Sequence, residues 1–153
     1  MIEVEIDDPA WTSALPEAED VAVRAAEAAL KAASQVGGLT VLLADDEAVA
    51  DLNTRFRGKA GPTNVLSFPA PDTARPHLGD IALAFGVCAG EARTQGKPLA
   101  DHLTHLVAHG VLHLVGYDHI TDTEAETMEA LERQLLSGLG VPDPYDDGAT
   151  HAR

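Results

Sequence analysis

The stretch from residue 102 to residue 119 reads HLTHLVAHGVLHLVGYDH and holds five of the seven histidines in the chain. The first four, His102, His105, His109 and His113, are three, four and four residues apart, so they fall on one face of a helix. Apolar residues fill most of the remaining positions, which predicts a buried helix over 98–115. Imidazoles removed from water need hydrogen-bond partners or a metal ion. The rest of the fold must therefore enclose this helix and satisfy its histidines.

His109, His113 and His119 carry the sharpest signal in this stretch. One helical turn separates His109 from His113, so both rings can reach one ion at about 2.0–2.1 Å. Gly116 can end the helix and turn the chain back, which would bring His119 to the same ion. Three histidines and a water form an open catalytic zinc site, whereas structural zinc sites normally have four protein ligands. We expect one Zn²⁺ per chain, although three imidazoles also suit nickel, copper and iron.

One residue distinguishes this pattern from the metzincin proteases, which share the spacing His-x3-His-x2-Gly-x2-His. The metzincins place a glutamate, their general base, directly after the first histidine. Gly110 stands at that position here and offers no carboxylate. The sequence therefore disfavours peptide hydrolysis by the metzincin route.

Strands and helices alternate around the histidine stretch. Apolar patterning predicts strands over 2–6, 39–43, 65–68 and 81–85. Capping and periodicity predict helices over 16–35, from 45 or 46 to about 56, and over about 87–95 and 122–138. We expect one α/β (α+β) domain over residues 1–153, with a small mixed sheet of about four strands packed with helices, and a loosely ordered tail from about residue 142.

Length and composition are those of one globular domain. The chain has 153 residues, of which 45% are hydrophobic and 23% charged, and this balance excludes a disordered chain. Cys88 is the only cysteine, so an intramolecular disulfide is impossible and a cysteine-based zinc site is disfavoured. The acidic start lacks the apolar run of a secretion signal, and no apolar stretch reaches the roughly 18 residues that a membrane span needs. We therefore expect a cytoplasmic protein that does not associate with membranes.

The net charge is −15, from 10 basic and 25 acidic residues. Taken alone, it argues against nucleic-acid binding, because such proteins neutralise phosphates with lysine and arginine. The distribution is uneven: residues 55–97 hold six basic and three acidic residues, or +3, which leaves −18 for the remainder. We expect a locally positive cleft on an acidic body.

Several motifs resemble those of the YbeY family of bacterial endoribonucleases. Residues 109–119, HGVLHLVGYDH, look like the family signature. Further similar elements follow one another in the family's order, namely Leu52-Asn53 with Arg57-Gly58-Lys59, PTNVLSFP at 62–69, LGDI at 78–81 and GVPDPY at 140–145. The resemblance extends from about residue 45 to 145. The family usually has aspartate where this chain has Asn64, and an asparagine cannot act as a base at pH 7.

The resemblance implies a single α/β domain with zinc held by His109, His113 and His119, and a functional arginine at Arg57. It implies cleavage of single-stranded RNA, with roles in 16S rRNA 3′-end maturation and ribosome quality control. The implied partners are ribosomal RNA, the ribosome or a protein of its small subunit, and the Era GTPase.

The expected catalytic residues are Arg57 and His109. Zinc can lower the pKa of bound water toward about 7 and polarise a phosphoryl oxygen, and the arginine fork pairs with two phosphate oxygens. Our hypothesis is that zinc holds the attacking water or the scissile phosphate while Arg57 binds the phosphate charge. Arg55 and Lys59 are candidate RNA contacts.

Weaker signals surround these residues. His105 and Asp118 are candidates for orienting a ligand histidine through a hydrogen bond. The aromatic residues Trp11, Phe56 and Phe68 are too few and scattered to predict a platform for stacked bases.

Two other functions remain open on the sequence. Because Gly110 removes the expected general base, the chain could be a ribosome-assembly factor that binds RNA around a mainly structural metal. A metal-dependent hydrolase of another phosphate ester would use the same metal chemistry.

Overall fold

One mixed sheet of four strands organises the computed structural model, which describes residues 1–58, 61, 63–118 and 120–145. The strands are β1 (Ile2–Ile6), β2 (Gly38–Ala44), β3 (Val65–Pro69) and β4 (His77–Ala84), in the order β1-β2-β4-β3. β2 is parallel to β1 and β4, whereas β3 runs antiparallel to β4. The predicted small mixed sheet is confirmed, and β3 forms one of its edges.

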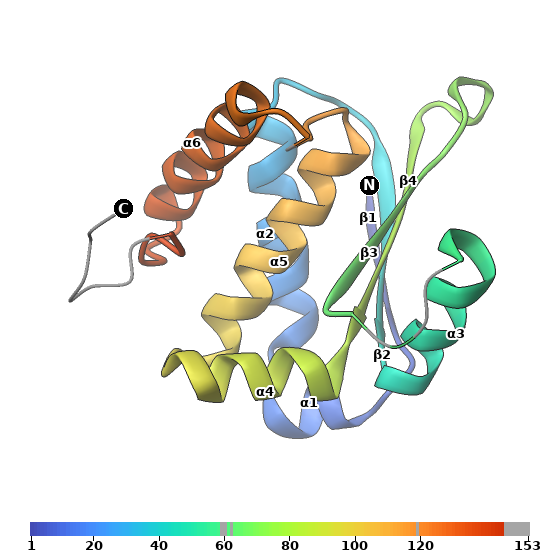
Figure 1. Cartoon of the computed structure of the whole chain (residues 1–153), viewed down its shortest axis with the longest axis vertical. Helices are drawn as coiled ribbons and strands as arrows, with labels where there is room; N and C mark the ends of the chain where they lie inside the picture. The colour runs from blue at the N-terminus through green and yellow to red at the C-terminus, as the bar shows by residue number, and fades with distance from the viewer. Residues whose placement is uncertain (59–60, 62, 119, 146–153) are drawn as a thin grey trace.

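The helices cover both faces of this sheet (Figure 1). They are α1 (Ala10–Ala14), α2 (Ala18–Ala32), α3 (Asp46–Arg57), α4 (Phe85–Gln95), α5 (Leu99–Leu114) and α6 (Asp122–Gly138), with a short 3₁₀ turn η1 (Asp72–Ala74). α2 and α5 pack on one face, α3 packs on the other, and α6 packs against α2 and α5. The predicted histidine helix, α5, therefore lies between the sheet and α6. Across the described ranges, no helix has the length and apolar character needed to cross a membrane.

Two elements depart from the sequence-based prediction. No element was expected between residues 7 and 15, yet α1 forms there because Trp11 is fully buried and its Nε1 donates to the Ala44 carbonyl at 2.9 Å. β4 begins at His77 and not near Ile81, because its first residues pair with β2 and β3. Both differences arise from contacts between segments that are distant in sequence.

The chain after α6 folds back onto that helix as far as it is described. Arg133 Nε lies 3.0 Å from Asp143 Oδ2, and the Tyr145 hydroxyl donates to Glu132 at 2.6 Å. We expected a loose tail from about residue 142. The structure attaches residues 143–145 to α6, and residues 146–153 lie outside the described part of the chain.

At Gly110, α5 approaches the sheet closely. A Cβ at this position would lie 3.2 Å from Ile81 Cγ2 and 3.3 Å from both Ser67 Oγ and Val65 Cγ2. The Ser67 hydroxyl also donates to the Gly110 carbonyl at 3.1 Å. The position that holds the catalytic glutamate in metzincins therefore faces the sheet in this chain.

Replacing Gly110 with alanine should destabilise the fold. Overpacking of this kind costs about 1–3 kcal/mol, and the better helix propensity of alanine offsets at most about 1 kcal/mol. Denaturant unfolding would measure the difference. The control is Gly138→Ala in α6, where no atom lies within 4 Å of a built Cβ, so this variant should be as stable as the parent or more so. Equal stability of the two variants would show that α5 can move away from the sheet without cost.

Candidate metal centre

A cavity of about 730 Å³ opens between α5, the edge strand β3 and the end of α3. His105, His109 and His113 line it from α5, and Arg57 lines it from α3. Asp118 follows α5 and is the only carboxylate among the described residues that line the cavity. The cavity thus gathers imidazoles, one guanidinium and one carboxylate from segments that are far apart in sequence.

His109 and His113 present their Nε2 atoms to each other. These atoms lie 3.1 Å apart, and the rings meet edge to face at 81°. Two nitrogens that bind one tetrahedral zinc at 2.0–2.1 Å are separated by about 3.3 Å. The observed separation therefore fits a shared metal ion with little movement of either side chain.

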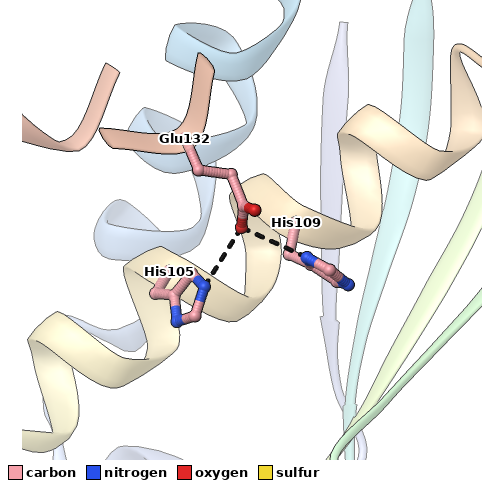
Figure 2. Close-up of side chains that lie close together, drawn as sticks. All are labelled: His105, His109 and Glu132. Atoms are coloured by element: carbon pink, nitrogen blue, oxygen red, sulfur yellow. Dashed lines mark hydrogen bonds and ion pairs between the residues drawn. The ribbon is translucent and has the colours of Figure 1, made fainter. Parts of the chain in front are cut away.

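Glu132 of α6 points between two histidines of α5, as Figure 2 shows. Its Oε2 lies 3.1 Å from His105 Nε2 and 3.1 Å from His109 Nδ1, and its Oε1 accepts from the Tyr145 hydroxyl at 2.6 Å. An ionised carboxylate can only accept hydrogen bonds, so both ring nitrogens that face it carry a hydrogen. A proton on Nδ1 of His109 leaves its Nε2 with a free lone pair on the side of His113. Glu132 therefore sets the tautomer that a metal ligand needs.

The pKa of Glu132 shows that its partners outweigh its burial. The side chain is fully buried, and burial alone raises the pKa of a carboxyl group. The hydrogen bonds from His105, His109 and Tyr145 act in the opposite direction and lower the pKa of Glu132 to about 2. Burial and the neighbouring Glu132 raise the pKa of Tyr145, so its hydroxyl remains a donor.

A second grouping uses the glutamate itself. His105, His109 and Glu132 each offer one ligand atom, and these atoms all lie within 4.8 Å of one another. The group could hold a metal ion, with His109 binding through Nδ1. The two arrangements share His109 but use opposite nitrogens of its ring. Variants of His105 and His113 can therefore distinguish them.

Three predicted site residues are not placed at the cavity by the described part of the structure. Arg55 is not among the cavity-lining residues, and its Nε lies 3.5 Å from Asp51 on the exposed side of α3. His119 and Lys59 lie outside the described residues. Among the described basic residues of segment 55–97, only Arg57 lines the cavity.

Glu132 and Tyr145 were not predicted as site residues from the sequence. A signal for Glu132 was present, because it follows Met128 by four residues on a face of α6 that also buries Leu135 and Leu136. An acidic residue on an otherwise apolar helix face is rarely buried without a partner. Tyr145 ends the GVPDPY element of the family resemblance, but its contact with Glu132 depends on how the chain turns after α6.

A second polar network lies behind Asn64, which lines the cavity. The Asn64 amide donates to Glu91 at 3.1 Å, and His102 Nε2 lies 2.9 Å from the same carboxylate. Asn64 Oδ1 also accepts from the Val65 amide at 2.7 Å. Burial lowers the pKa of His102, against the effect of its bond to Glu91. The asparagine is thus held in the cavity wall, and an aspartate there would place two carboxylates together.

The fold and the cavity together define a class of protein. The cavity of this small α/β domain gathers imidazoles that are suited to bind a metal ion, and a buried carboxylate orients one of them. With an arginine beside them, this is the arrangement of metal-dependent hydrolases.

Comparisons with known proteins narrow the class to one family. The family model described as endoribonuclease YbeY matches residues 4–140. An endoribonuclease YbeY from Paramagnetospirillum magneticum is 52% identical over 157 residues, covering 95% of this chain and 96% of that protein. Another from Maricaulis maris is 50% identical over 150 residues, covering 94% and 91%. The chain belongs to the YbeY family, and it is an endoribonuclease.

A solved structure supports the fold. The solution structure of TM1509 from Thermotoga maritima superposes with a TM-score of 0.59, at 24% identity, and covers 97% of this chain and 99% of that one. At this level of identity the likeness bears on the fold alone.

Low pH should lower the free energy of unfolding because it protonates Glu132. The folded pKa of about 2 lies below the ordinary value of 4.5, so its contribution to stability is complete above about pH 4.5 and is lost as the pH falls toward 2. In metal-free protein, Glu132→Gln should lower the free energy of unfolding at pH 7 by roughly 1–3 kcal/mol, because the amide loses the negative charge and replaces one of the two acceptor oxygens with a donor that faces a buried donor.

Denaturant unfolding between pH 7 and pH 2 would test this expectation. The difference between wild type and Glu132→Gln should shrink as the pH falls. Glu126→Gln, a change at an exposed residue of the same helix, serves as the control and should follow wild type at every pH. A difference that stays constant down to pH 2 would contradict the role of the ionised carboxylate.

Proposed function

We propose that the chain cleaves single-stranded RNA with a zinc ion held by His109, His113 and His119 and with Arg57 on the scissile phosphate. The observation that carries the proposal is the 3.1 Å separation of the Nε2 atoms of His109 and His113 at the cavity, with Glu132 on the other nitrogen of His109. His119 enters as the third ligand through its place in the sequence motif. This set is favoured over His105, His109 and Glu132 because Glu132 already accepts three hydrogen bonds.

Each group of the chain has a defined task in this proposal. When bound, zinc supplies a Lewis acid and lowers the pKa of a coordinated water toward about 7. Glu132 keeps the proton on Nδ1 of His109 and makes that imidazole a stronger donor through Nε2. Arg57 forms no ion pair with another described residue, so its guanidinium fork can bind two phosphate oxygens and stabilise the charge that develops there.

The biological setting is proposed from the family. Its members are named for endoribonuclease activity, and the motifs of this chain resemble those of enzymes that mature ribosomal RNA. We assign the chain to 16S rRNA 3′-end maturation and ribosome quality control in the cytoplasm. Its proposed partners are the ribosome or a protein of the small subunit, and the Era GTPase.

Metal content of two histidine variants tests the ligand set. His113→Asn should abolish the binding of one zinc per chain and the cleavage of RNA. His105→Asn should keep one zinc per chain and weaken its affinity by at most about 10- to 100-fold, the range seen when a group that orients a ligand is lost. Elemental analysis after dialysis and competition with a chromophoric chelator would measure both. His77→Asn is a control, since His77 lies outside the cavity lining. If His113→Asn retained zinc and His105→Asn lost it, the ligands would instead be His105, His109 and Glu132.

Arg57 variants test phosphate binding. Arg57→Ala should lower kcat/KM for a single-stranded RNA by about 100-fold, the effect of removing one donor to a developing charge, and leave the zinc content unchanged. Arg57→Lys should recover part of the activity because it restores the charge without the fork. Arg55→Ala, two residues earlier in α3 and outside the cavity lining, should change kcat/KM by no more than a few-fold.

Two controls complete this experiment. The His113→Asn protein, purified in parallel, should be inactive, because any cleavage it showed would come from a contaminating nuclease. Arg57→Glu should lose both RNA cleavage and RNA binding. If it kept both, Arg57 would have no part in phosphate binding.

A further inference from the structure

The rings of Phe56 and Phe68 lie together on the surface. Their centroids are 5.7 Å apart and the rings are inclined at 71°. Phe56, near the end of α3, is 64% exposed, whereas Phe68 in β3 is half-buried. The expectation that the aromatic residues are scattered is therefore wrong for this pair.

Phe56 lies beside the part of α3 that lines the cavity. Phe56 directly precedes Arg57 and lies one helical turn after Asn53, and both of these neighbours line the cavity. Phe68 stands in β3 between Ser67 and Pro69, which line the cavity. Because successive side chains of a strand point to opposite faces, Phe68 itself points to the α3 face of the sheet. The aromatic pair therefore lies on the α3 side of the edge strand, and Phe56 is next to Arg57 of the cavity lining.

Packing accounts for Phe68 but not for Phe56. Phe68 covers the small apolar cluster between α3 and the sheet. Phe56 meets Phe68 edge to face and leaves most of its surface in water. A single exposed apolar residue is common and implies nothing by itself. The informative feature is its position beside the one described arginine that lines the cavity.

Single-stranded RNA has the chemistry that this surface matches. Its unpaired bases offer flat π faces, which stack on aromatic side chains whatever the base, while arginine binds the backbone phosphate. A phenyl ring has no hydrogen-bonding group, so it would bind bases without selecting among them. Bases inside a duplex are already stacked on their neighbours and cannot lie on the ring.

We propose that Phe56, in edge-to-face contact with Phe68, is a stacking subsite for the base of a nucleotide next to the phosphate bound at Arg57. The subsite rests on the proposed RNA-cleaving function and adds to it a physical basis for choosing single strands. It places one base outside the cavity rim while its phosphate enters the cavity.

Equilibrium binding of a short labelled single-stranded RNA to the zinc-loaded protein tests the subsite. Phe56→Ala should weaken binding by about 5- to 100-fold, the range for losing one stacked base. Phe56→Leu should be nearly as weak, because it is apolar but not aromatic, and Phe56→Tyr should bind like wild type. The control is Val36→Ala, which removes an apolar side chain that is 92% exposed and lies outside the cavity lining; it should bind like wild type. Thermal unfolding of all four variants would show that the fold is intact.

A tryptophan in place of Phe56 gives a direct signal of stacking. The native Trp11 is fully buried, so Phe56→Trp adds an exposed fluorophore at the proposed subsite. Single-stranded RNA should quench its fluorescence, whereas an abasic strand of the same length and an RNA duplex should not. Val36→Trp should show no quenching with any of the three.

The outcomes separate this inference from the function on which it rests. If wild type and Phe56→Ala bind RNA equally while Arg57→Glu loses binding, the subsite is refuted and the RNA-cleaving function stands. Equal quenching by the intact and abasic strands also refutes the subsite. If the zinc-loaded wild type binds no single-stranded RNA, both proposals fail.

Discussion

The buried carboxylate of Glu132 is the constraint on which the site depends. An ionised group removed from water costs several kcal/mol unless donors surround it. Here the donors come from His105 and His109 on α5 and from Tyr145 after α6. The two helices and the following segment can therefore pack together only in an arrangement that aims these three groups at one carboxylate. Because His109 is one of them, the packing of α6 on α5 also fixes which of its nitrogens faces the cavity.

One face of α5 packs on the sheet and another carries the histidines of the cavity. The face with Gly110 packs against β3 and β4, and its missing side chain permits the close approach. The face with His105 and His109 meets Glu132, and His113 continues it into the cavity. A carboxylate directly after His109 would point into the sheet, so this helix could not use the metzincin base even if the residue were changed. Any charged group that acts in the cavity beside the histidines must therefore come from another element. Arg57 is such a group and comes from α3.

The sequence was informative where local periodicity controls the structure. The strand over 2–6, the helix over 122–138 and the histidine face of α5 were predicted because each depends on residues close in sequence. The first half of β4 and the helix around Trp11 were not, because pairing with other strands and burial against Ala44 produce them. For the same reason the sequence could indicate the histidines but not Glu132 and Tyr145, whose roles arise only when α6 packs on α5.

The net charge of −15 affects RNA binding through the positions of the basic residues relative to the cavity. Most proteins that bind nucleic acid gain affinity by neutralising many phosphates and releasing counterions. Arg57 is the only lysine or arginine among the described residues that line this cavity, and the acidic body around it repels the rest of the RNA backbone. In the proposed function, affinity comes from a few short-range contacts, namely the guanidinium on one phosphate, the metal and a stacked base. Because these proposed contacts require an accessible, unpaired strand, we expect the acidic surface to discriminate against RNA that cannot enter the cavity.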